Sequence, residues 1–359
     1  MVATIADVAR LAGVGVGTVS RVLNGRPNVG ASTRARVLAV ITELDYVPNA
    51  TARSLSSGRT RTIAVVCIHF IIPSVIERIH GAERTLTDAG FDLIIRNVET
   101  AERRDQALRD LTHAERVDGA ILISVTPNEQ DYQHIRAAGL PVVLVDASHR
   151  SMARFVCDDV EGGATAGRHL LSLGHRRIGF VGDPPRPSLG VPSSRSRLRG
   201  LREALAEQGL DVAPHHLAEG EHFRAGGYES ALRILKLKDR PTAVFAANDT
   251  LAFGVLQAAR ELGLRVPTDL SVIGYDDIDA ADLVGMTTVH QPLYDSGAAA
   301  AARLLRLLNG QDHGPLRTVM PTRLTVRETT APPNTGTAPV KSIHGSSAPV
   351  SSSNHHRVR

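Results

Sequence analysis

The sequence predicts an all-α segment at the N-terminus, followed by an α/β body of two lobes in which parallel sheets carry helices on both faces. Over the first 48 residues, apolar side chains recur at helical spacing in short segments separated by glycines. From residue 62 onward, short apolar strands alternate with amphipathic helices, a pattern that builds parallel sheets. The series of strands and helices occurs twice, which predicts two lobes with a binding cleft between them.

Length, charge and cysteine usage narrow the class of protein. A chain of 359 residues with 42% hydrophobic content can fill more than one core. Residues 1–61 contain eight arginines, no lysine and three acidic residues, which suits a polyanionic partner, although a solvated basic face is the alternative. No apolar run approaches the ~20 residues of a membrane span, and the start carries no signal-peptide pattern. Cys67 and Cys157 lack metal-ligand spacing, so we expect buried, reduced thiols in a cytoplasmic protein without membrane association.

The first helix is predicted from its capping signals. Thr4 and Asp7 have the spacing of a capping box, in which each side chain bonds the backbone N–H of the other residue. The helix should end at Gly13. Its inward-facing residues are expected to be Val8, Leu11 and Ala12.

A second and a third helix complete a small three-helix core. The second, around residues 16–23, has one apolar face made by Val19, Val22 and Leu23. Its other face presents Val16, Gly17, Ser20 and Arg21. Ser32 is expected to cap the third helix, whose apolar positions are Val37, Leu38, Ile41 and Leu44. Two short helices joined by a glycine-containing turn form a helix-turn-helix, although an unrelated helical bundle shares each local signal.

The run TIADVARLAGVGVGTVSRVLNGRPNVGASTRARVLAVITELDYVPNATARSL resembles, almost position for position, the DNA-binding headpiece of the LacI/GalR (lactose-repressor) family. The resemblance implies a recognition helix in the major groove of double-stranded operator DNA. There Arg21 would donate two hydrogen bonds to a guanine edge, with Val16 and Gly17 as the other base-facing positions. A nonspecific phosphate contact is the alternative for Arg21. The phosphate and groove contacts that the resemblance implies are Thr4, Thr18, Ser20, Asn24, Thr33 and Tyr46.

Two glycines depart from the family pattern. Gly15 stands where the family usually has a hydroxyl residue, so the cap of the recognition helix relies on backbone alone. Gly17 lies inside that helix, where glycine costs ~1 kcal/mol relative to alanine. Close backbone approach to DNA, or room for a thymine methyl beside Val16, would compensate. The operator sequence therefore does not follow from the resemblance.

Residues 49–61 are predicted to join the headpiece, residues 1–48, to the body. Within them NATARSLS resembles the family's hinge helix, which orders on operator DNA. The resemblance implies that Leu55 wedges into a base step from the minor groove, while Asn49 and Ala52 contact the backbone and the groove floor. An eight-residue helix is marginal by itself in water, which suits a switch. A plain linker leading through residues 56–58 is the alternative.

The body is predicted over residues 62–328. Strands are expected near 63–68, 92–96, 119–124 and 142–146, and again near 177–182, 242–247 and 270–275. Helices are expected near 74–89, 101–114, 128–138, 160–173, 195–208, 225–236 and 249–262. The segments GHRRIGFVGD, SRLRGLREAL, FAANDTLAFGVLQAARELGLRVPTDLSVIGYDD and TTVHQPLYDSG resemble the sensor body of the same family, which shares its fold with periplasmic sugar-binding proteins. This implies that the chain crosses between lobes near 157–160, 288–292 and 318–323.

Residues 329–359 are expected to form a disordered tail, because they are rich in Ala, Pro, Ser and Thr without apolar periodicity. Some members of the family carry a C-terminal leucine heptad that joins dimers into tetramers. This tail carries no such heptad, so we expect a homodimer.

The resemblance places an effector, a small molecule that controls DNA binding, in the cleft between the lobes. Arg197 falls where the family has its ligand-clamping arginine, and a guanidinium can hold two hydroxyls or a carboxylate. Asp146, Asn248 and Asp276 stand at the ends of predicted strands, where open α/β sheets bind ligands. The full set of expected effector-binding residues is Phe70, Asp146, Ser193, Arg197, His222, Asn248 and Asp276.

Several of these residues have a structural alternative. Asn248 or Asp249, like Asp276 or Asp277, has the position of a cap for the following helix. Arg197 has the spacing to pair with Glu203. A lone histidine such as His222 is more often structural than ligand-binding.

The mouth of the first lobe departs from the family. Many members carry an Asp-Ile-Ser-Asn-Pro-Phe-Phe-like loop, where this chain has the largely apolar HFIIPSV at residues 69–75. The effector is therefore not restricted to a standard sugar. We expect a sugar, a nucleoside or another small metabolite.

Three other function classes compete with a regulator. An enzyme is not expected, because no phosphate loop, dinucleotide fingerprint, nucleophile elbow or HExxH pattern occurs, and neither a cofactor nor a metal is implied. A solute-binding protein would suit the body but not the headpiece. An architectural DNA protein without an effector would suit the altered mouth. The sequence thus predicts a dimeric DNA-binding regulator, a repressor by the family's default.

Overall fold

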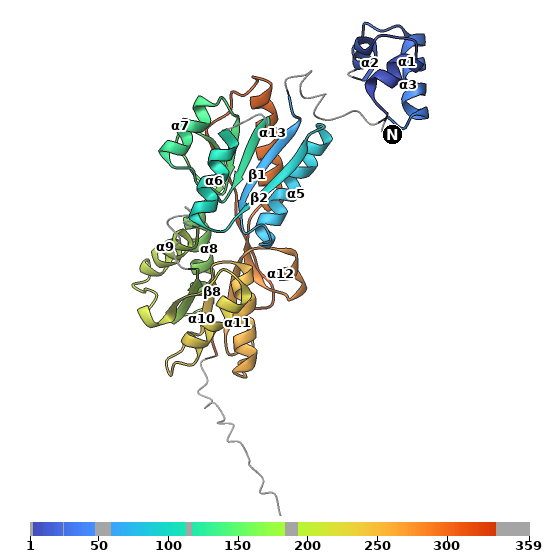
Figure 1. Cartoon of the computed structure of the whole chain (residues 1–359). Helices are drawn as coiled ribbons and strands as arrows, with labels where there is room; N and C mark the ends of the chain where they lie inside the picture. Colours follow the sequence, from blue (N-terminus) through green and yellow to red (C-terminus); the bar gives the residue numbers. More distant parts are fainter. Residues whose placement is uncertain (1–2, 24, 47–58, 113–116, 184–192, 335–359) are drawn as a thin grey trace, which may run out of the picture.

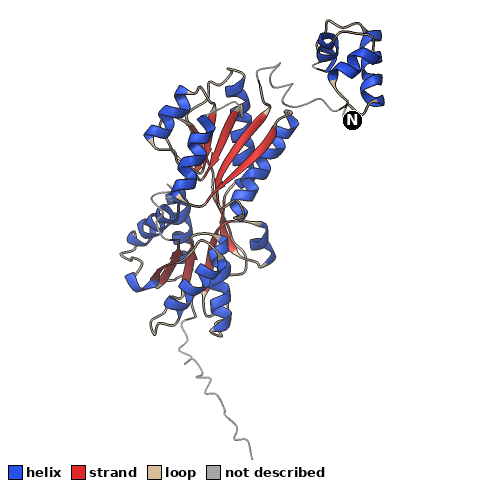
Figure 2. Cartoon of the chain, in the orientation of Figure 1, coloured by secondary structure: helices blue, strands red, loops and turns tan. Residues whose placement is uncertain are grey.

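The computed structural model describes residues 3–23, 25–46, 59–112, 117–183 and 193–334 (Figure 1). Within these ranges the chain forms a three-helix headpiece and a body of two sheets flanked by helices (Figure 2). The predicted fold class is therefore confirmed. No helix within the same ranges is long and apolar enough to cross a membrane.

The headpiece consists of α1 (Ile5–Leu11), α2 (Val16–Leu23) and α3 (Ala31–Glu43). The predicted capping box begins α1, because the Asp7 N–H donates to Thr4 Oγ1 at 3.3 Å and the Thr4 N–H donates to Asp7 Oδ2 at 3.0 Å. The three helices share one apolar core, made by Val8, Ala9, Ala12, Val19, Val22, Val37 and Val40.

Three details of the predicted headpiece are wrong. Leu11 and Leu38 were expected inside, but each is about half exposed. Each lies on its helix about 110° from the centre of the buried face, outside the stripe that the other two helices cover. Ser32 does not cap α3, because Gly30 occupies the N-cap position without a side-chain hydrogen bond.

Lobe 1 is built on a six-stranded parallel sheet with the strand order β11-β5-β4-β3-β1-β2. Its elements are β1 (Thr62–Ile68), α5 (Pro73–Asp88), β2 (Asp92–Val98), α6 (Ala101–Thr112), β3 (Gly119–Ile123), α7 (Glu129–Ala137), β4 (Val142–Val145), β5 (Ala153–Cys157), α13 (Leu293–Leu308) and β11 (Arg317–Met320). Helices α6 and α7 cover one face, and α5 and α13 cover the other. Because both faces are covered, β3 and β4 are buried throughout.

Lobe 2 has a second six-stranded sheet with the order β12-β10-β9-β8-β6-β7, parallel except for β12. Its elements are α8 (Asp159–Ser172), β6 (Ile178–Gly182), α9 (Ser193–Ala206), a 3-10 turn (Pro214–His216), β7 (Leu217–Glu219), α10 (Arg224–Leu235), β8 (Ala243–Ala246), α11 (Asp249–Glu261), β9 (Ser271–Asp276), α12 (Asp279–Leu283), β10 (Thr287–His290) and β12 (Arg323–Thr325). One large apolar core fills this lobe.

The chain crosses between the lobes three times. It passes from β5 to α8, from β10 to α13, and from β11 to β12. These crossings coincide with the three segments expected near 157–160, 288–292 and 318–323. Consequently the helix α13, late in the sequence, packs against α5 of the first lobe (Figure 1).

Lobe 2 continues past residue 328, where a disordered tail was expected to begin. Thr329 is buried, and its backbone carbonyl accepts from the Val272 N–H at 2.8 Å. Its hydroxyl accepts from the Thr287 N–H at 2.9 Å, and the Ser271 hydroxyl donates to the Ala331 carbonyl at 3.0 Å. Residues 329–331 are thus held by hydrogen bonds to neighbouring strands rather than by apolar burial. Amino-acid composition does not reveal hydrogen bonds of this kind. Residues 335–359 of the expected tail lie outside the described ranges.

Both cysteines are free thiols. Cys67 is buried in β1 and Cys157 is half-buried at the end of β5. Burial raises the pKa of each thiol to about 12. Both thiols are therefore protonated at neutral pH. The expected burial is found for Cys67, whereas Cys157 is only half-buried.

Candidate functional site: a DNA-reading face and an inter-lobe cavity

The outer face of α2 presents the residues expected to read DNA. Val16 is 46% exposed, and Gly17 and Arg21 are also exposed, whereas Val19 and Val22 hold the opposite face in the headpiece core. An exposed apolar side chain can contact a thymine methyl, and an exposed arginine can contact a guanine edge. The structure thus keeps Val16, Gly17 and Arg21 in solvent on α2.

The two unusual glycines both face open space. Within the described residues, a Cβ added to Gly15 or to Gly17 would meet no atom within 4 Å beyond its chain neighbours and its own helix backbone. Internal packing therefore does not require glycine at either position. Room for a close external partner remains as the explanation that the geometry allows.

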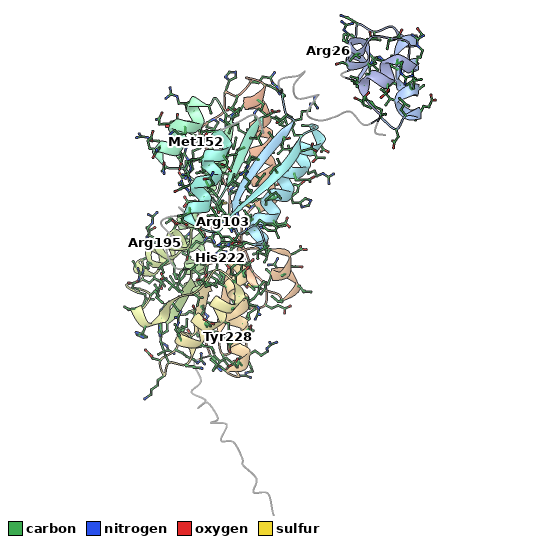
Figure 3. The ribbon with its side chains drawn as sticks, viewed as in Figure 1. Arg26, Arg103, Met152, Arg195, His222 and Tyr228 are labelled. Atoms are coloured by element: carbon green, nitrogen blue, oxygen red, sulfur yellow. The ribbon has the colours of Figure 1, made fainter. Side chains whose placement is uncertain are left out.

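A residue that sequence reasoning missed holds α2 in place. Arg34 of α3 donates from Nη2 to the carbonyl oxygen of Arg26 at 2.6 Å, and from Nη1 to that of Val22 at 3.5 Å. These bonds tie α3 to the end of α2 and the loop that follows it; Arg26 itself is exposed there (Figure 3). An arginine in the amphipathic pattern of α3 gives no signal of this structural role.

The remaining expected DNA contacts are placed as follows. Thr4 is exposed at the start of α1, while Thr18, Ser20, Thr33 and Tyr46 are half-buried around the rim of the headpiece. Asn24 and the hinge residues Asn49, Ala52 and Leu55 lie outside the described residues.

A cavity opens between the two lobes. Lobe 1 contributes Ile68, His69, Ile72, Ser74, Val75, Arg78, Ser124 and Asp146 to its wall. Lobe 2 contributes Asp183, Ser193, Arg197, His222, Asn248 and Asp276, and the crossover before α13 contributes Gln291. His222 lies at the waist between the lobes (Figure 3). Six of the seven expected effector residues therefore converge on one cavity.

Arg197 is the most heavily bonded side chain of this wall. Its Nε donates to Asp159 Oδ1 at 2.8 Å, its Nη1 donates to the Ala247 carbonyl at 2.5 Å, and the guanidinium lies 3.7 Å above the Tyr275 ring. Burial opposes its charge, but the carboxylates of Asp159 and Asp276 outweigh burial and raise the pKa of Arg197. The expected alternative, a pair with Glu203, is wrong.

Gln291 links Arg78 of lobe 1 to Asp276 of lobe 2, which lies near Arg197. Its Nε2 donates to Asp276 Oδ1 at 2.6 Å, and its Oε1 accepts from Arg78 Nη2 at 3.3 Å. Asp276 lies 3.8 Å from Arg197 Nη1, and burial raises the pKa of this carboxyl against the opposing charge of Arg197. The two lobes are thus linked through side chains at the cavity itself.

His222 belongs to a polar cluster on the lobe 2 wall. Its Nδ1 lies 3.6 Å from Asp183 Oδ2, and its Nε2 lies 3.4 Å from Asn248 Nδ2. Burial opposes the charge of Asp183, yet the hydrogen bond and the charge of His222 overcome burial and lower the pKa of this carboxyl. A polar ligand group would meet acceptors and donors side by side here.

Of the residues with a helix-cap alternative, Asn248 is a cap, and Asp249, Asp276 and Asp277 are not. Asn248 does cap α11, because its Oδ1 accepts from the Leu251 N–H at 2.8 Å, and it lines the cavity as well. Asp249 instead accepts from the Thr288 hydroxyl at 2.6 Å and from the Ile278 N–H at 3.0 Å. Neither Asp276 nor Asp277 caps α12, whose N-cap is Ile278 without a side-chain bond.

Phe70 is the one expected effector residue that is not part of the cavity wall. Its side chain is 44% exposed, and its backbone N–H donates to Asn97 Oδ1 at 3.0 Å. The neighbouring His69 and Ile72 line the cavity in its place. The apolar character of this mouth, predicted from the sequence, is thus retained on the wall.

Sequence reasoning missed Arg78, Asp183 and Gln291. Asp183 follows β6 directly, so the strand-end rule that indicated Asp146 would have indicated it also. Arg78 and Gln291 carried no such signal, because they are 213 residues apart and meet only through the crossover.

The chain carries a helix-turn-helix headpiece and, in a separate body, a polar cavity between two lobes, the architecture of a DNA-binding transcription regulator with a ligand-binding body. Two family models match the chain: bacterial regulatory proteins of the lacI family over residues 4–49, and the periplasmic binding protein-like domain over residues 168–330. The chain belongs to the LacI family of bacterial regulatory proteins.

Individual relatives agree with this assignment along nearly the whole chain. The HTH-type transcriptional repressor PurR of Photobacterium profundum is 37% identical over 319 residues, covering 87% of this chain and 93% of the relative. Catabolite control protein A of Priestia megaterium is 33% identical over 332 residues, covering 91% and 99%. These relatives are regulators, which agrees with the expectation that the chain is not an enzyme.

Solved structures show the same architecture. The lac repressor dimer bound to operator and the anti-inducer ONPF is 29% identical with a TM-score of 0.82, covering 92% of this chain and 100% of that one. A complex of the transcriptional regulator CelR with cellobiose is 32% identical with a TM-score of 0.67, covering 91% and 99%. The chain is therefore a DNA-binding transcriptional repressor of this family with an effector-binding body.

Proposed function

We propose that this repressor binds a short inverted-repeat operator as a homodimer in the cytoplasm, and that a small molecule in the inter-lobe cavity changes its operator affinity. The observation that carries the proposal is the convergence of polar side chains from both lobes, with Gln291 between them, on one cavity. A ligand that contacts both walls has different contacts in open and closed arrangements of the lobes, which is the requirement for a switch.

Exposed apolar side chains support the homodimer. Ile94 and Ile95 of β2 are half-exposed, and β2 is an edge strand of its sheet; Ile76 of α5, a helix that contacts β2, is half-exposed as well. In lobe 2, Leu283 at the end of α12 is 87% exposed beside Val284. Exposed apolar side chains of this size are candidates for a protein–protein interface. The relative solved on operator DNA is itself a dimer.

The side chains that line the cavity support a particular class of effector. Asp146, Asp183 and Asp276 accept hydrogen bonds, Asn248 and Arg197 donate them, and Ile68, Ile72 and Val75 supply an apolar surface. A small polar metabolite with one apolar face, such as a sugar or a nucleoside, fits this combination. Related regulators have been solved with cellobiose and with ribose.

Selection from random duplexes, followed by fluorescence anisotropy on the selected sequence, tests DNA binding. We expect an inverted repeat whose affinity falls steeply with salt, because phosphate contacts release counterions. Arg21→Ala should lose about 1–3 kcal/mol on the selected operator and relax its sequence preference. Arg10→Ala removes the same charge from α1, so it serves as the control. Enrichment of no sequence would refute the operator proposal.

Thermal-shift screening tests the sensor. A ligand that binds only the folded body must raise its melting temperature, and the same compound should change operator affinity. A compound that stabilises the body without changing operator affinity would contradict the switch. Absence of any stabilising sugar, nucleoside or small acid would assign the cavity to a different class of signal.

A further inference from the structure

The two lobes hold an arginine in the same structural position. Arg78 lies on α5, the helix that follows the first strand of lobe 1, and Arg197 lies on α9, the helix that follows the first strand of lobe 2. A glycine follows each arginine by three residues, Gly81 in α5 and Gly200 in α9. Each of these helices crosses a helix that enters from a crossover, α13 in lobe 1 and α8 in lobe 2.

The two crossings agree residue for residue. A Cβ added to Gly297 of α13 would lie 1.8 Å from the backbone oxygen of Arg78, and one added to Gly163 of α8 would lie 2.0 Å from that of Arg197. The reciprocal contacts are Gly81 with the Tyr294 oxygen at 2.0 Å and Gly200 with the Val160 oxygen at 1.8 Å. In each lobe, therefore, backbone contact between two helices fixes the position of the arginine.

An aspartate occupies the equivalent place in each sheet. Asp146 directly follows β4 and Asp276 ends β9, and these strands hold the same position in the two strand orders. Both aspartates have positive φ, 51° and 119°. Arg78 Nη2 lies 3.7 Å from Asp146 Oδ2, and Arg197 Nη1 lies 3.8 Å from Asp276 Oδ1. Each wall of the cavity thus presents the same arginine–aspartate pair.

The pairs differ in how well the arginine is satisfied. Asp159, which bonds Arg197 Nε, precedes the crossing glycine of α8 by four residues, and the residue four before the glycine of α13 is Leu293. Arg78 accordingly has a buried Nε without a partner in the described part of the chain. Its two hydrogen bonds, to the Ser74 carbonyl and to Gln291 Oε1, are both 3.3 Å long.

An under-bonded buried guanidinium is costly unless a partner arrives, because unpaired donors forfeit their hydration. Arg78 is 4% exposed and still lines the cavity, so a bound molecule can supply that partner. Gln291 connects it to Asp276 of the opposite lobe. A ligand oxygen bound at Arg78 would therefore also affect the pair of Arg197 and Asp276.

We propose that Arg78 is a second effector-anchoring residue, the lobe 1 counterpart of Arg197, which binds an acceptor oxygen of the effector. This rests on the proposed function of the cavity as an effector site. An effector held by both arginines spans the cleft, with a hydroxyl, carbonyl or carboxylate oxygen at each end. The distance between its two acceptor oxygens is then a determinant of specificity.

Isothermal titration calorimetry of the full-length chain tests the proposal, with D-ribose, cellobiose, adenosine and citrate as probes. Arg78→Met keeps the volume of the side chain and removes its donors, so a probe that binds the wild type should bind about 10- to 100-fold more weakly. Arg78→Lys should recover part of the loss. Arg303→Met is the matched control, since Arg303 is a buried, ion-paired arginine of α13 outside the cavity wall, and it should keep the wild-type affinity.

Deoxy analogues of the binding probe separate contact from structure. Removing the oxygen that Arg78 holds should weaken wild-type binding and leave the affinity of Arg78→Met unchanged, because the pair has already been broken. Two outcomes would overturn the role of Arg78 while leaving the proposed effector function in place. One is an equal loss in both proteins for every deoxy analogue, and the other is undiminished binding to Arg78→Met. If no probe binds the wild type, the proposed effector function fails, and this inference fails with it.

Discussion

The guanidinium of Arg197 lies 3.7 Å from the centroid of the Tyr275 ring, and the hydroxyl of that tyrosine is buried without a hydrogen-bond partner among the described residues. The ring lies against the guanidinium, and Asp159 accepts a hydrogen bond from Arg197 Nε. A buried cation over an aromatic face is stabilised by roughly 2 kcal/mol, whereas an unpaired buried hydroxyl costs about 1–3 kcal/mol. The ring and the hydroxyl of Tyr275 thus have opposite effects on stability.

Tyr275→Phe separates these effects. It keeps the ring under Arg197 and removes the unpaired hydroxyl, so we expect the melting temperature of the body to rise by a few degrees with effector affinity retained. Tyr275→Leu removes the ring and should weaken effector binding about tenfold. Thermal unfolding and calorimetry measure the two effects. A lower melting temperature for Tyr275→Phe would show that the hydroxyl has a partner.

The crossing of α8 and α9 offers a second prediction. Gly163→Ala would place a Cβ 2.0 Å from the backbone oxygen of Arg197, which must separate the helices and displace the arginine. We expect a loss of about 1–3 kcal/mol in the free energy of unfolding. Gly167→Ala on the same helix would place its Cβ 3.0 Å from Ala204 Cβ and 3.1 Å from Leu201 Cδ1, a much milder overlap, so its effect should be smaller. Equal effects in denaturant unfolding would contradict a special role for the Arg197 crossing.

Sequence periodicity predicted the repeated strand–helix units, because apolar strands and amphipathic helices carry strong signals, whereas the three crossings were implied by the family resemblance alone. Periodicity did not reveal the helices α12 and α13, nor the strands β5, β7, β10, β11 and β12, which have three to five residues each. Strands this short span too few positions for an alternating pattern. They are defined by pairing with distant strands instead.

The same limit applies to the site. Strand ends indicated Asp146, Asn248 and Asp276, since the carboxyl ends of parallel strands meet at one edge of a sheet. Arg78 could not be found in this way, because an arginine in an amphipathic helix pattern indicates a solvent-facing position. Its burial depends on Gly297 and Gln291, more than 200 residues further along the chain. Sequence pattern reports local periodicity, and this contact is not local.

Gly17 permits a test on the DNA-reading face. Beyond its own helix, no atom of the described residues lies within 4 Å of a Cβ at this position, so Gly17→Ala should stabilise α2 by up to about 1 kcal/mol. If DNA approaches the helix backbone closely, the added methyl should nevertheless lower operator affinity. Thermal unfolding of the headpiece and anisotropy with the selected operator measure the two quantities. Ala35→Gly on the exposed side of α3 is the reverse change and should alter stability alone; a gain in operator affinity for Gly17→Ala would rule out close approach.

Asp249 predicts how the stability of lobe 2 depends on pH. Burial, with the nearby charge of Asp276, raises the pKa of Asp249 from 3.8 to about 8. An unfolded aspartate has a pKa of about 3.9. Between these values the folded state keeps a proton that the unfolded state has lost, so the free energy of unfolding falls as pH rises from about 4 to about 8.

Asp249→Asn cannot ionise, and its amide can still accept from the Ile278 N–H and donate to the Thr288 hydroxyl. We therefore expect its melting temperature, relative to the wild type, to be higher at pH 8 than at pH 5. Asp269→Asn is the control, because hydrogen bonds from Arg265 lower the pKa of Asp269 to about 2. Asp269 is therefore ionised in both the folded and the unfolded protein at pH 5 and at pH 8. Its effect should be the same at both pH values. A pH-independent offset for Asp249→Asn would mean that Asp249 is already ionised in the folded protein at pH 5, with the Thr288 hydroxyl and the Ile278 N–H sufficient to hold its charge.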